Sequence, residues 1–184
     1  MKIFLPQETI SAVKKKYIFV DTCLLLDWAN FHKKEKSLFS DSLNQLIIND
    51  CALVTVEPVI VEFFLGSNKE SLKIKKAFLE SLKITIIPIR SVEYKIEDLV
   101  LEYGEKARGK LSYVDICLGA AIKQFSNKSL VLTRNYKDFP ERIFDCSAIF
   151  SISLSQEIRT YCFYSYDQNK AIKTIKINDE KIPF

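Results

Sequence analysis

Short hydrophobic runs alternate with longer amphipathic stretches along most of this chain. Runs of β-branched and aromatic residues predict buried strands at 17–21, 51–56, 84–87, 129–133 and 146–153. Apolar residues at helical spacing predict intervening helices at about 22–29, 40–48, 58–65, 68–82, 92–103 and 113–125. Strands that alternate with helices indicate an α/β domain with a mainly parallel five-stranded sheet, covered by helices on both faces.

The two ends of the chain depart from this alternation. Residues 1–16 precede the first strand and predict a short arm or an extra helix. After the fifth strand, residues 157–166 and 171–177 alternate weakly on either side of a polar break, which predicts a C-terminal β-hairpin extension. We therefore expect an arm at 1–16, the α/β domain at 17–153 and the hairpin extension at 154–184, packed on the same domain.

Composition places the chain among ordinary globular proteins. Hydrophobic residues make up 48% and charged residues 27%, and the low content of Gly and Pro argues against disorder. No apolar run approaches the roughly 20 residues that span a bilayer, so no membrane association is expected. The N-terminal stretch lacks a long apolar core like that of a signal peptide. A cytoplasmic protein is therefore expected.

Several kinds of site are excluded or disfavoured by the residues present. The five cysteines are widely spaced and form no CxxC pair, so free thiols are favoured over a zinc site or a redox pair. The single histidine excludes HExxH zinc chemistry, and neither GxGxxG nor GxxxxGK[ST] occurs. The net charge of +4 is compatible with nucleic-acid binding but does not establish it.

Four acidic residues stand where a parallel sheet would bring them to one edge. Asp21 ends the first predicted strand, and Glu62 lies in the helix after the second. Asp115 lies in the first turn of the helix before the fourth strand, and Asp138 follows that strand. Open α/β sheets bind ligands at this edge. Two carboxylates about 4 Å apart repel by about 4 kcal/mol at an effective dielectric near 20, so convergence would require a cation or shared protons.

Each of these acids also has an ordinary structural explanation. Asp21 could cap the helix that follows it, Ser112-x-x-Asp115 is similar to a capping box, and Asp138 could be a turn residue. Glu62 is harder to explain in this way, because it lies among apolar residues where a charge is costly unless it is paired. Considered together, the four positions favour an all-oxygen site for one or two Mg²⁺ or Mn²⁺ ions. Such ions support phosphodiester hydrolysis.

The segments around these acids resemble the PIN-domain nucleases. The resemblance is carried by Val20-Asp21-Thr22, by Val61-Glu62-Phe63-Phe64-Leu65-Gly66 and by Asp115-Ile116-Cys117-Leu118-Gly119-Ala120-Ala121. The most specific stretch, Thr133-Arg134-Asn135-Tyr136-Lys137-Asp138-Phe139, is similar to the T-x-N-x-x-D-F signature of VapC-like toxins. The resemblance covers about residues 17–150. It implies a three-layer α/β/α sandwich and a metal-dependent endoribonuclease, the toxin of a type II toxin–antitoxin pair.

The resemblance also implies roles for individual residues. Asp21, Glu62, Asp115 and Asp138 would form the acidic quartet, supported by Thr22, Thr133 and Asn135. Some family members place another acid where this chain has the neutral Asn135. The basic stretch with Lys106, Arg108 and Lys110 would neutralise RNA phosphates or would simply be solvated. RNA is the expected substrate, and a cognate antitoxin protein and a second copy of the chain are candidate partners.

Two other interpretations stay open at this point. The chain could be a catalytically weak PIN-like module that binds RNA or protein without a functional metal site. A phosphatase of the haloacid-dehalogenase type also begins with a strand that ends in Asp, but it needs a second Asp two residues later. Cys23 occupies that position here, which disfavours the phosphatase.

Overall fold

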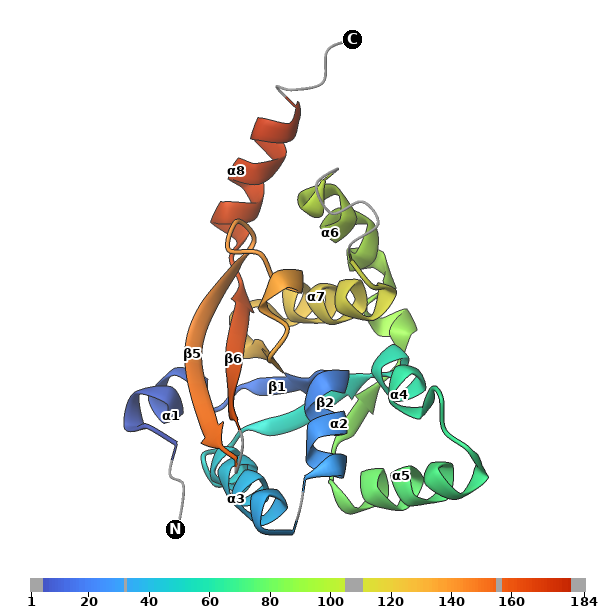
Figure 1. The fold of residues 1–184 in the computed structure, drawn as a ribbon. Helices are drawn as coiled ribbons and strands as arrows, with labels where there is room; N and C mark the ends of the chain where they lie inside the picture. The colour runs from blue at the N-terminus through green and yellow to red at the C-terminus, as the bar shows by residue number, and fades with distance from the viewer. Residues whose placement is uncertain (1–4, 32, 105–110, 155–156, 180–184) are drawn as a thin grey trace.

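The computed structural model describes residues 5–31, 33–104, 111–154 and 157–179 of the chain. The strands are β1 (Tyr17–Val20), β2 (Ala52–Val56), β3 (Thr85–Ile87), β4 (Ser129–Thr133), β5 (Phe144–Ser153) and β6 (Ile158–Tyr166). These described strands form one six-stranded sheet in the order β3-β2-β1-β4-β6-β5 (Figure 1). The pairs β3–β2, β2–β1 and β1–β4 are parallel, whereas β6 is antiparallel to both β4 and β5. The predicted α/β class is therefore confirmed.

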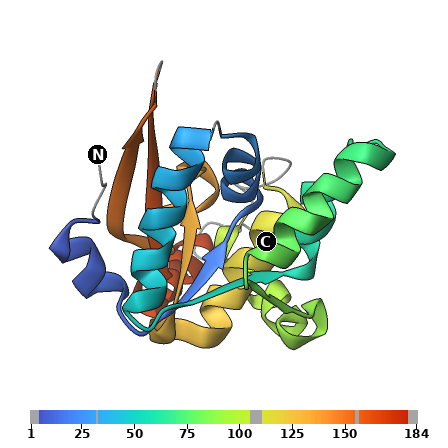
Figure 2. The same ribbon diagram turned by 90° about the horizontal axis from the view of Figure 1, so that it is seen from below.

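Helices cover both faces of this sheet. They are α1 (Gln7–Val13), α2 (Thr22–Asn30), α3 (Lys33–Ile48), α4 (Glu57–Phe64), α5 (Lys69–Ser81), α6 (Ile96–Tyr103), α7 (Tyr113–Phe125) and α8 (Gln168–Asp179). Short 3-10 helices occur at Ile89–Ser91 (η1), Glu93–Lys95 (η2), Ser126–Lys128 (η4) and Tyr136–Asp138 (η5). In Figure 1, α3 and α5 lie below the sheet and α6, α7 and α8 above it, and Figure 2 gives the view from the α3 side. None of the helices in the described ranges is long and apolar enough to cross a membrane.

The prediction for the C-terminal part of the chain is wrong in two respects, and the first concerns the sheet. Residues 158–166 do not form half of an appended hairpin, because they form β6 and lie between β4 and β5 in the sheet. Tyr161 and Phe163 are fully buried, and Tyr164 is 5% exposed. A strand with both faces buried belongs to the interior of a sheet. The sheet is consequently mixed and six-stranded, rather than mainly parallel and five-stranded.

The second half of the predicted hairpin is also wrong, because residues 168–179 form α8. The Oδ1 atom of Asp167 accepts hydrogen bonds from the backbone N–H groups of Asn169 (2.8 Å) and Lys170 (3.1 Å), which caps the start of this helix. Ala171 and Thr174 are buried at a spacing of three residues, which is a helical spacing. The alternation of β-branched residues that suggested a strand is overridden by this cap and by packing.

Two aromatic clusters fill the space between the sheet and its helices. On the α3 side, the ring of Phe39 lies 5.5 Å from that of Tyr161, which stacks on Phe150 at 5.1 Å. On the α7 side, the ring of Phe139 lies 5.3 Å from Phe144. Such pairs contribute beyond the apolar area that they bury. Both clusters include residues of β5 or β6, so these strands belong to the core.

The N-terminal segment contains a helix, as one of the two predicted alternatives has it. This helix, α1, packs against β5, the strand at one edge of the sheet, and the hydroxyl of Thr9 donates to the carbonyl of Ile149 (3.1 Å). Covering an edge strand with a helix limits its pairing with other chains.

A matched pair of substitutions in β6 tests whether this strand is part of the core. Phe163→Ala removes a fully buried ring, so we expect the free energy of unfolding to fall by about 3–5 kcal/mol. Thr160→Ala changes an exposed position of the same strand and should alter stability by about 0.5 kcal/mol or less. Denaturant-induced unfolding measures both, and similarly small losses would indicate a detached hairpin.

Candidate functional site

The junction after β1 is held against the end of β4. Parallel pairing places Val20 opposite Leu132, and the backbone N–H of Asp21 donates to the Leu132 carbonyl (3.3 Å). Asp21 and Thr133, the residues that follow in the two strands, are therefore neighbours. The Thr133 hydroxyl, fully buried, donates to Oδ2 of Asp21 (2.5 Å), and the thiol of Cys23 donates to the same oxygen (3.0 Å).

Asp21 occupies the N-cap position of α2 without using its side chain as a cap. Its backbone is extended there, and its carbonyl accepts hydrogen bonds from the N–H groups of Leu24 (3.1 Å) and Leu25 (3.2 Å). Its carboxylate makes no capping hydrogen bond. The side chain is instead turned toward Thr133, so helix capping does not explain why this position is acidic.

Glu62 is brought to the same junction by α4. Its side chain is half-buried, and its Oε2 accepts a hydrogen bond from the hydroxyl of Thr22, which directly follows Asp21. Thr22 itself is buried. The first turn of α2 therefore connects two of the four predicted acids.

Asp115 lies at the start of α7 and takes part in its cap. Ser112 is the N-cap residue: its hydroxyl oxygen accepts from the backbone N–H of Asp115 (3.1 Å) and donates to Oδ2 of the same residue (2.5 Å). The predicted capping interaction is therefore present. It uses one carboxylate oxygen of Asp115, a residue that is only 7% exposed.

The stretch that follows β4 forms one hydrogen-bonded turn. The backbone N–H of Asn135 donates to the hydroxyl oxygen of Thr133 (2.9 Å), and its side-chain amide donates to Oδ2 of Asp138. The hydroxyl of Tyr103 in α6 donates to the Asp138 carbonyl (2.6 Å). Thr133 therefore contacts both Asp21 and the residue that holds Asp138.

The four acids act on one another electrostatically. The pKa of Asp115 is raised from 3.8 to about 7, first by burial and then by the negative charges of Asp138, Asp21 and Glu62, while the hydrogen bond from Ser112 lowers it. The pKa of Asp138 is also raised, first by burial and then by the charge of Asp21. These couplings place Asp115 within electrostatic reach of the other three acids, and Asp138 within reach of Asp21.

The oxygen atoms at this edge are ligands that suit a hard divalent cation, but the carboxylates do not converge on one common point. Their described hydrogen-bond donors are uncharged hydroxyl, thiol and amide groups, and no ion pair among the described residues involves any of the four. Over the same residues, no group of three His, Cys, Asp or Glu side chains is arranged to hold a metal ion. Oxygen ligands and unneutralised charge fit Mg²⁺ or Mn²⁺. Ligation would require side-chain rotation.

The remaining predicted site residues are the basic ones. Lys106, Arg108 and Lys110 lie outside the described residues.

The sequence did not predict one further buried carboxylate close to this edge, in addition to those of Asp21 and Asp115. Asp27 in α2 is 4% exposed and pairs with Arg134, Arg159 and Tyr161. An acid among apolar residues, the feature that distinguished Glu62, also occurs at Asp27. Asp27 follows Leu24, Leu25 and Leu26, and a charge in such a run is costly unless it is paired.

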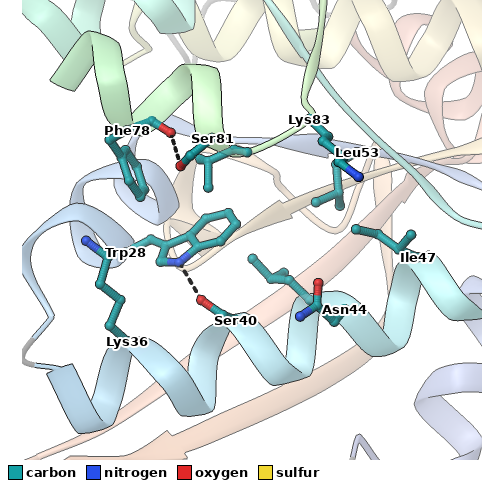
Figure 3. A pocket seen from close by; sticks show the side chains of 11 residues that line it. Trp28, Lys36, Ser40, Asn44, Ile47, Leu53, Phe78, Ser81 and Lys83 are labelled. Atoms are coloured by element: carbon teal, nitrogen blue, oxygen red, sulfur yellow. Dashed lines mark hydrogen bonds between the residues drawn. The ribbon is translucent and has the colours of Figure 1, made fainter.

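A pocket of about 600 Å³ lies away from the acids, between α3, α5 and β2 (Figure 3). Its lining side chains are Trp28, Lys36, Ser40, Leu43, Asn44, Ile47, Leu53, Phe78, Ser81, Leu82 and Lys83. The indole N–H of Trp28 donates to the Ser40 hydroxyl (3.0 Å), and the Lys36 ammonium lies 4.8 Å from the centre of the Phe78 ring. None of Asp21, Glu62, Asp115 and Asp138 lines this pocket. It is therefore separate from the acidic edge, the edge of the sheet at which these four acids lie.

The raised pKa of Asp115 predicts a specific pH dependence of stability. Between pH 4 and 7 the folded chain binds more protons at this residue than the unfolded chain, so the contribution of Asp115 to stability falls as pH rises through this range. Asp115→Asn removes the titration. In EDTA, we expect its Tm relative to wild type to increase from pH 5 to pH 8.

Thermal unfolding of both proteins at several pH values measures this difference. Asp41→Asn, at an exposed position of α3, is the matched control and should follow the wild type. A Tm difference between Asp115→Asn and wild type that does not change with pH would contradict the raised pKa.

Comparison with known proteins leaves this chain without a match: no family model, no curated protein and no solved structure is similar to it at a significant level. The feature that any function has to explain is the set of carboxylates at the carboxyl ends of β1 and β4.

Proposed function

We propose that this chain is a Mg²⁺- or Mn²⁺-dependent endoribonuclease that hydrolyses RNA phosphodiester bonds at the acidic edge. The observation that carries the proposal is the gathering of Asp21, Glu62, Asp115 and Asp138 with uncharged partners, where burial, and after it the charges of the other three acids, raise the pKa of Asp115. Four acids that repel one another weaken the fold unless a cation or protons compensate. Perturbed acids of this kind cluster at functional sites.

The proposed roles follow from the hydrogen bonds of each residue. Asp21, Asp115 and Asp138 would hold the cation, and Glu62 would ligate it or orient a water molecule. Thr133 holds Asp21 through Oδ2, which leaves Oδ1 for the cation. When bound, one or two such ions would activate water and stabilise the leaving oxygen.

The supporting residues determine which way these carboxylates face. Asn135 orients Asp138, and Thr22 orients Glu62. Both donors are uncharged, so they can keep their carboxylates in place without neutralising them. This preserves negative charge for a cation.

The biological setting is part of the same proposal. The T-x-N-x-x-D-F stretch supports a VapC-like toxin of a type II toxin–antitoxin pair, acting in the cytoplasm. Its partners would be RNA, a cognate antitoxin protein and, in a homodimer, a second copy of the chain. The PIN-like part of the fold would be the parallel strands β3-β2-β1-β4, which carry the candidate residues, with β6 and β5 as an addition at one side.

One alternative is favoured by a specific observation. Because the described carboxylates do not form a closed ligand set, the chain could be a PIN-like module that binds RNA or protein with little metal affinity. The two proposals differ in whether divalent ions bind the folded chain.

Cleavage of a mixed RNA pool tests the nuclease. We expect the wild type to cleave RNA with Mg²⁺ or Mn²⁺ and not with EDTA. Asp21→Asn should reduce the rate at least 100-fold, because loss of a group that merely supports a ligand already costs about 10- to 100-fold. Asp41→Asn serves as the control and should cleave like the wild type. Equal cleavage by the wild type and Asp21→Asn would refute the site assignment.

A thermal-shift titration with Mn²⁺ separates the nuclease from the non-enzymatic module. An ion at about 100 times its Kd stabilises the folded state by about 2.7 kcal/mol, which raises Tm by about 5–10 °C for a chain of this length. We expect this rise in the wild type and in Asp41→Asn, and its loss in Asp21→Asn. A wild type whose Tm does not respond to Mn²⁺ favours the module.

A further inference from the structure

The buried carboxylate of Asp27 links three parts of the structure that meet beside the acidic edge. Its Oδ1 accepts from Nη1 of Arg159 (2.5 Å), and its Oδ2 accepts from the hydroxyl of Tyr161 (2.9 Å). The same Oδ2 forms an ion pair with Nε of Arg134 (2.8 Å). These donors come from the start of β6 and from the residue that follows β4. A buried carboxylate with this many partners is a stable anchor for the groups that bind it.

The two arginines on this anchor differ in how much of the guanidinium is used. All three nitrogens of Arg159 have partners, because Nε and Nη2 contact Glu157 at 2.5 Å while Nη1 contacts Asp27. The Arg159 guanidinium also lies 5.3 Å from the centre of the Phe31 ring. Arg159 therefore serves to neutralise Asp27 and to hold β6 in place.

Arg134 keeps part of its guanidinium available. Its Nε contacts Asp27 at 2.8 Å and its Nη2 more weakly at 3.4 Å, and no described residue accepts a hydrogen bond from its Nη1. Its side chain is 47% exposed, whereas that of Arg159 is 26% exposed. One edge of the group is fixed and the other faces solvent.

The position of Arg134 in the chain, directly after β4, places its backbone at the acidic edge. It stands between Thr133, which donates to Asp21, and Asn135, which donates to Asp138. An anionic substrate that approaches four carboxylates needs positive charge beside them. The planar fork of Arg matches a phosphate, stays charged at all relevant pH values, and loses little freedom on binding when it is already held.

We propose that Arg134 contacts a phosphate of the substrate backbone and that Asp27 is a positioning residue that orients Arg134 for this contact. The inference rests on the proposed function, in that the ligand is the RNA backbone. It adds a substrate contact outside the carboxylate set. It also explains why a buried acid lies in α2 only six residues after Asp21.

Salt dependence of RNA binding tests the contact, because it reports the number of phosphates that the protein neutralises. Binding of a short labelled single-stranded RNA is measured in an Asp21→Asn parent, with Mg²⁺, over a range of salt concentrations. Arg134→Gln should weaken binding and reduce the slope of log K against log salt by about 0.7, the value for one phosphate of a single strand. Arg134→Lys should keep the slope with weaker binding.

Lys128→Gln, at an exposed position before the opposite end of β4, is the matched control and should leave the slope unchanged. A purely structural role of Arg134 would lower Tm and leave the slope as it is. An unchanged slope in Arg134→Gln, or no measurable binding by the parent, overturns the proposal.

A double-mutant cycle tests the positioning role of Asp27. Asp27→Asn should weaken RNA binding when Arg134 is present and should have no further effect in Arg134→Gln. Equal effects of Asp27→Asn in both backgrounds would refute positioning through Arg134. If the wild type cleaves RNA but Arg134→Gln has the same salt slope as its parent, only the Arg134 contact is refuted. If the wild type does not cleave RNA but Arg134→Gln has the smaller slope, only the nuclease proposal is refuted.

Discussion

The parallel pairing of β1 with β4 is the constraint on which the acidic edge depends. These strands lie more than a hundred residues apart in the chain, and their register brings Asp21 beside Thr133, whose hydroxyl donates to it. Parallel strands end at the same edge of a sheet. The connections that follow β1 and β4 therefore start side by side, and α4 and α7 deliver Glu62 and Asp115 to the same place.

The four acids of this edge differ from the buried acids of the rest of the molecule in the charge of their hydrogen-bond partners. Elsewhere, buried acids are paired with cations: Asp27 binds two arginines, and Glu102 binds Lys123 at 2.7 Å. At the acidic edge, the described hydrogen-bond donors to the carboxylates are uncharged, and no ion pair among the described residues involves these acids. Departures from otherwise consistent design are expected at functional sites, where stability is given up for chemistry.

Helix α2 connects the acidic edge to the part of the sheet that is antiparallel. Asp21 stands at its N-terminus, and Asp27 lies about 9 Å farther along the axis, at 1.5 Å per residue. Because β6 runs antiparallel to β4, its first residues lie past the end of β4, where Arg159 and Tyr161 reach Asp27. The C-terminal segment is therefore structurally coupled to the residues that carry the proposed function.

Local patterns in the sequence determined much of this protein. The hydrophobic runs predicted β1 to β5, the apolar spacing predicted most helices, and the Ser112 cap was predicted because it joins residues three apart. The positions of Asp21 and Asp138 after strands, of Asp115 in a first helical turn and of Glu62 within a helix also followed from these patterns. Such features depend on contacts within a few residues, which a sequence states directly.

Only the tertiary structure decided the remaining features. It decided that β6 enters the sheet between β4 and β5, that residues 168–179 form a helix, that the Asp21 carboxylate turns to Thr133 rather than capping α2, and which residues pair with Asp27. Each of these outcomes except the helix is a contact between residues distant in the chain. Strand preference depends on the neighbours that a strand finds. Periodicity can indicate that a residue is buried, but only packing determines what it is buried against.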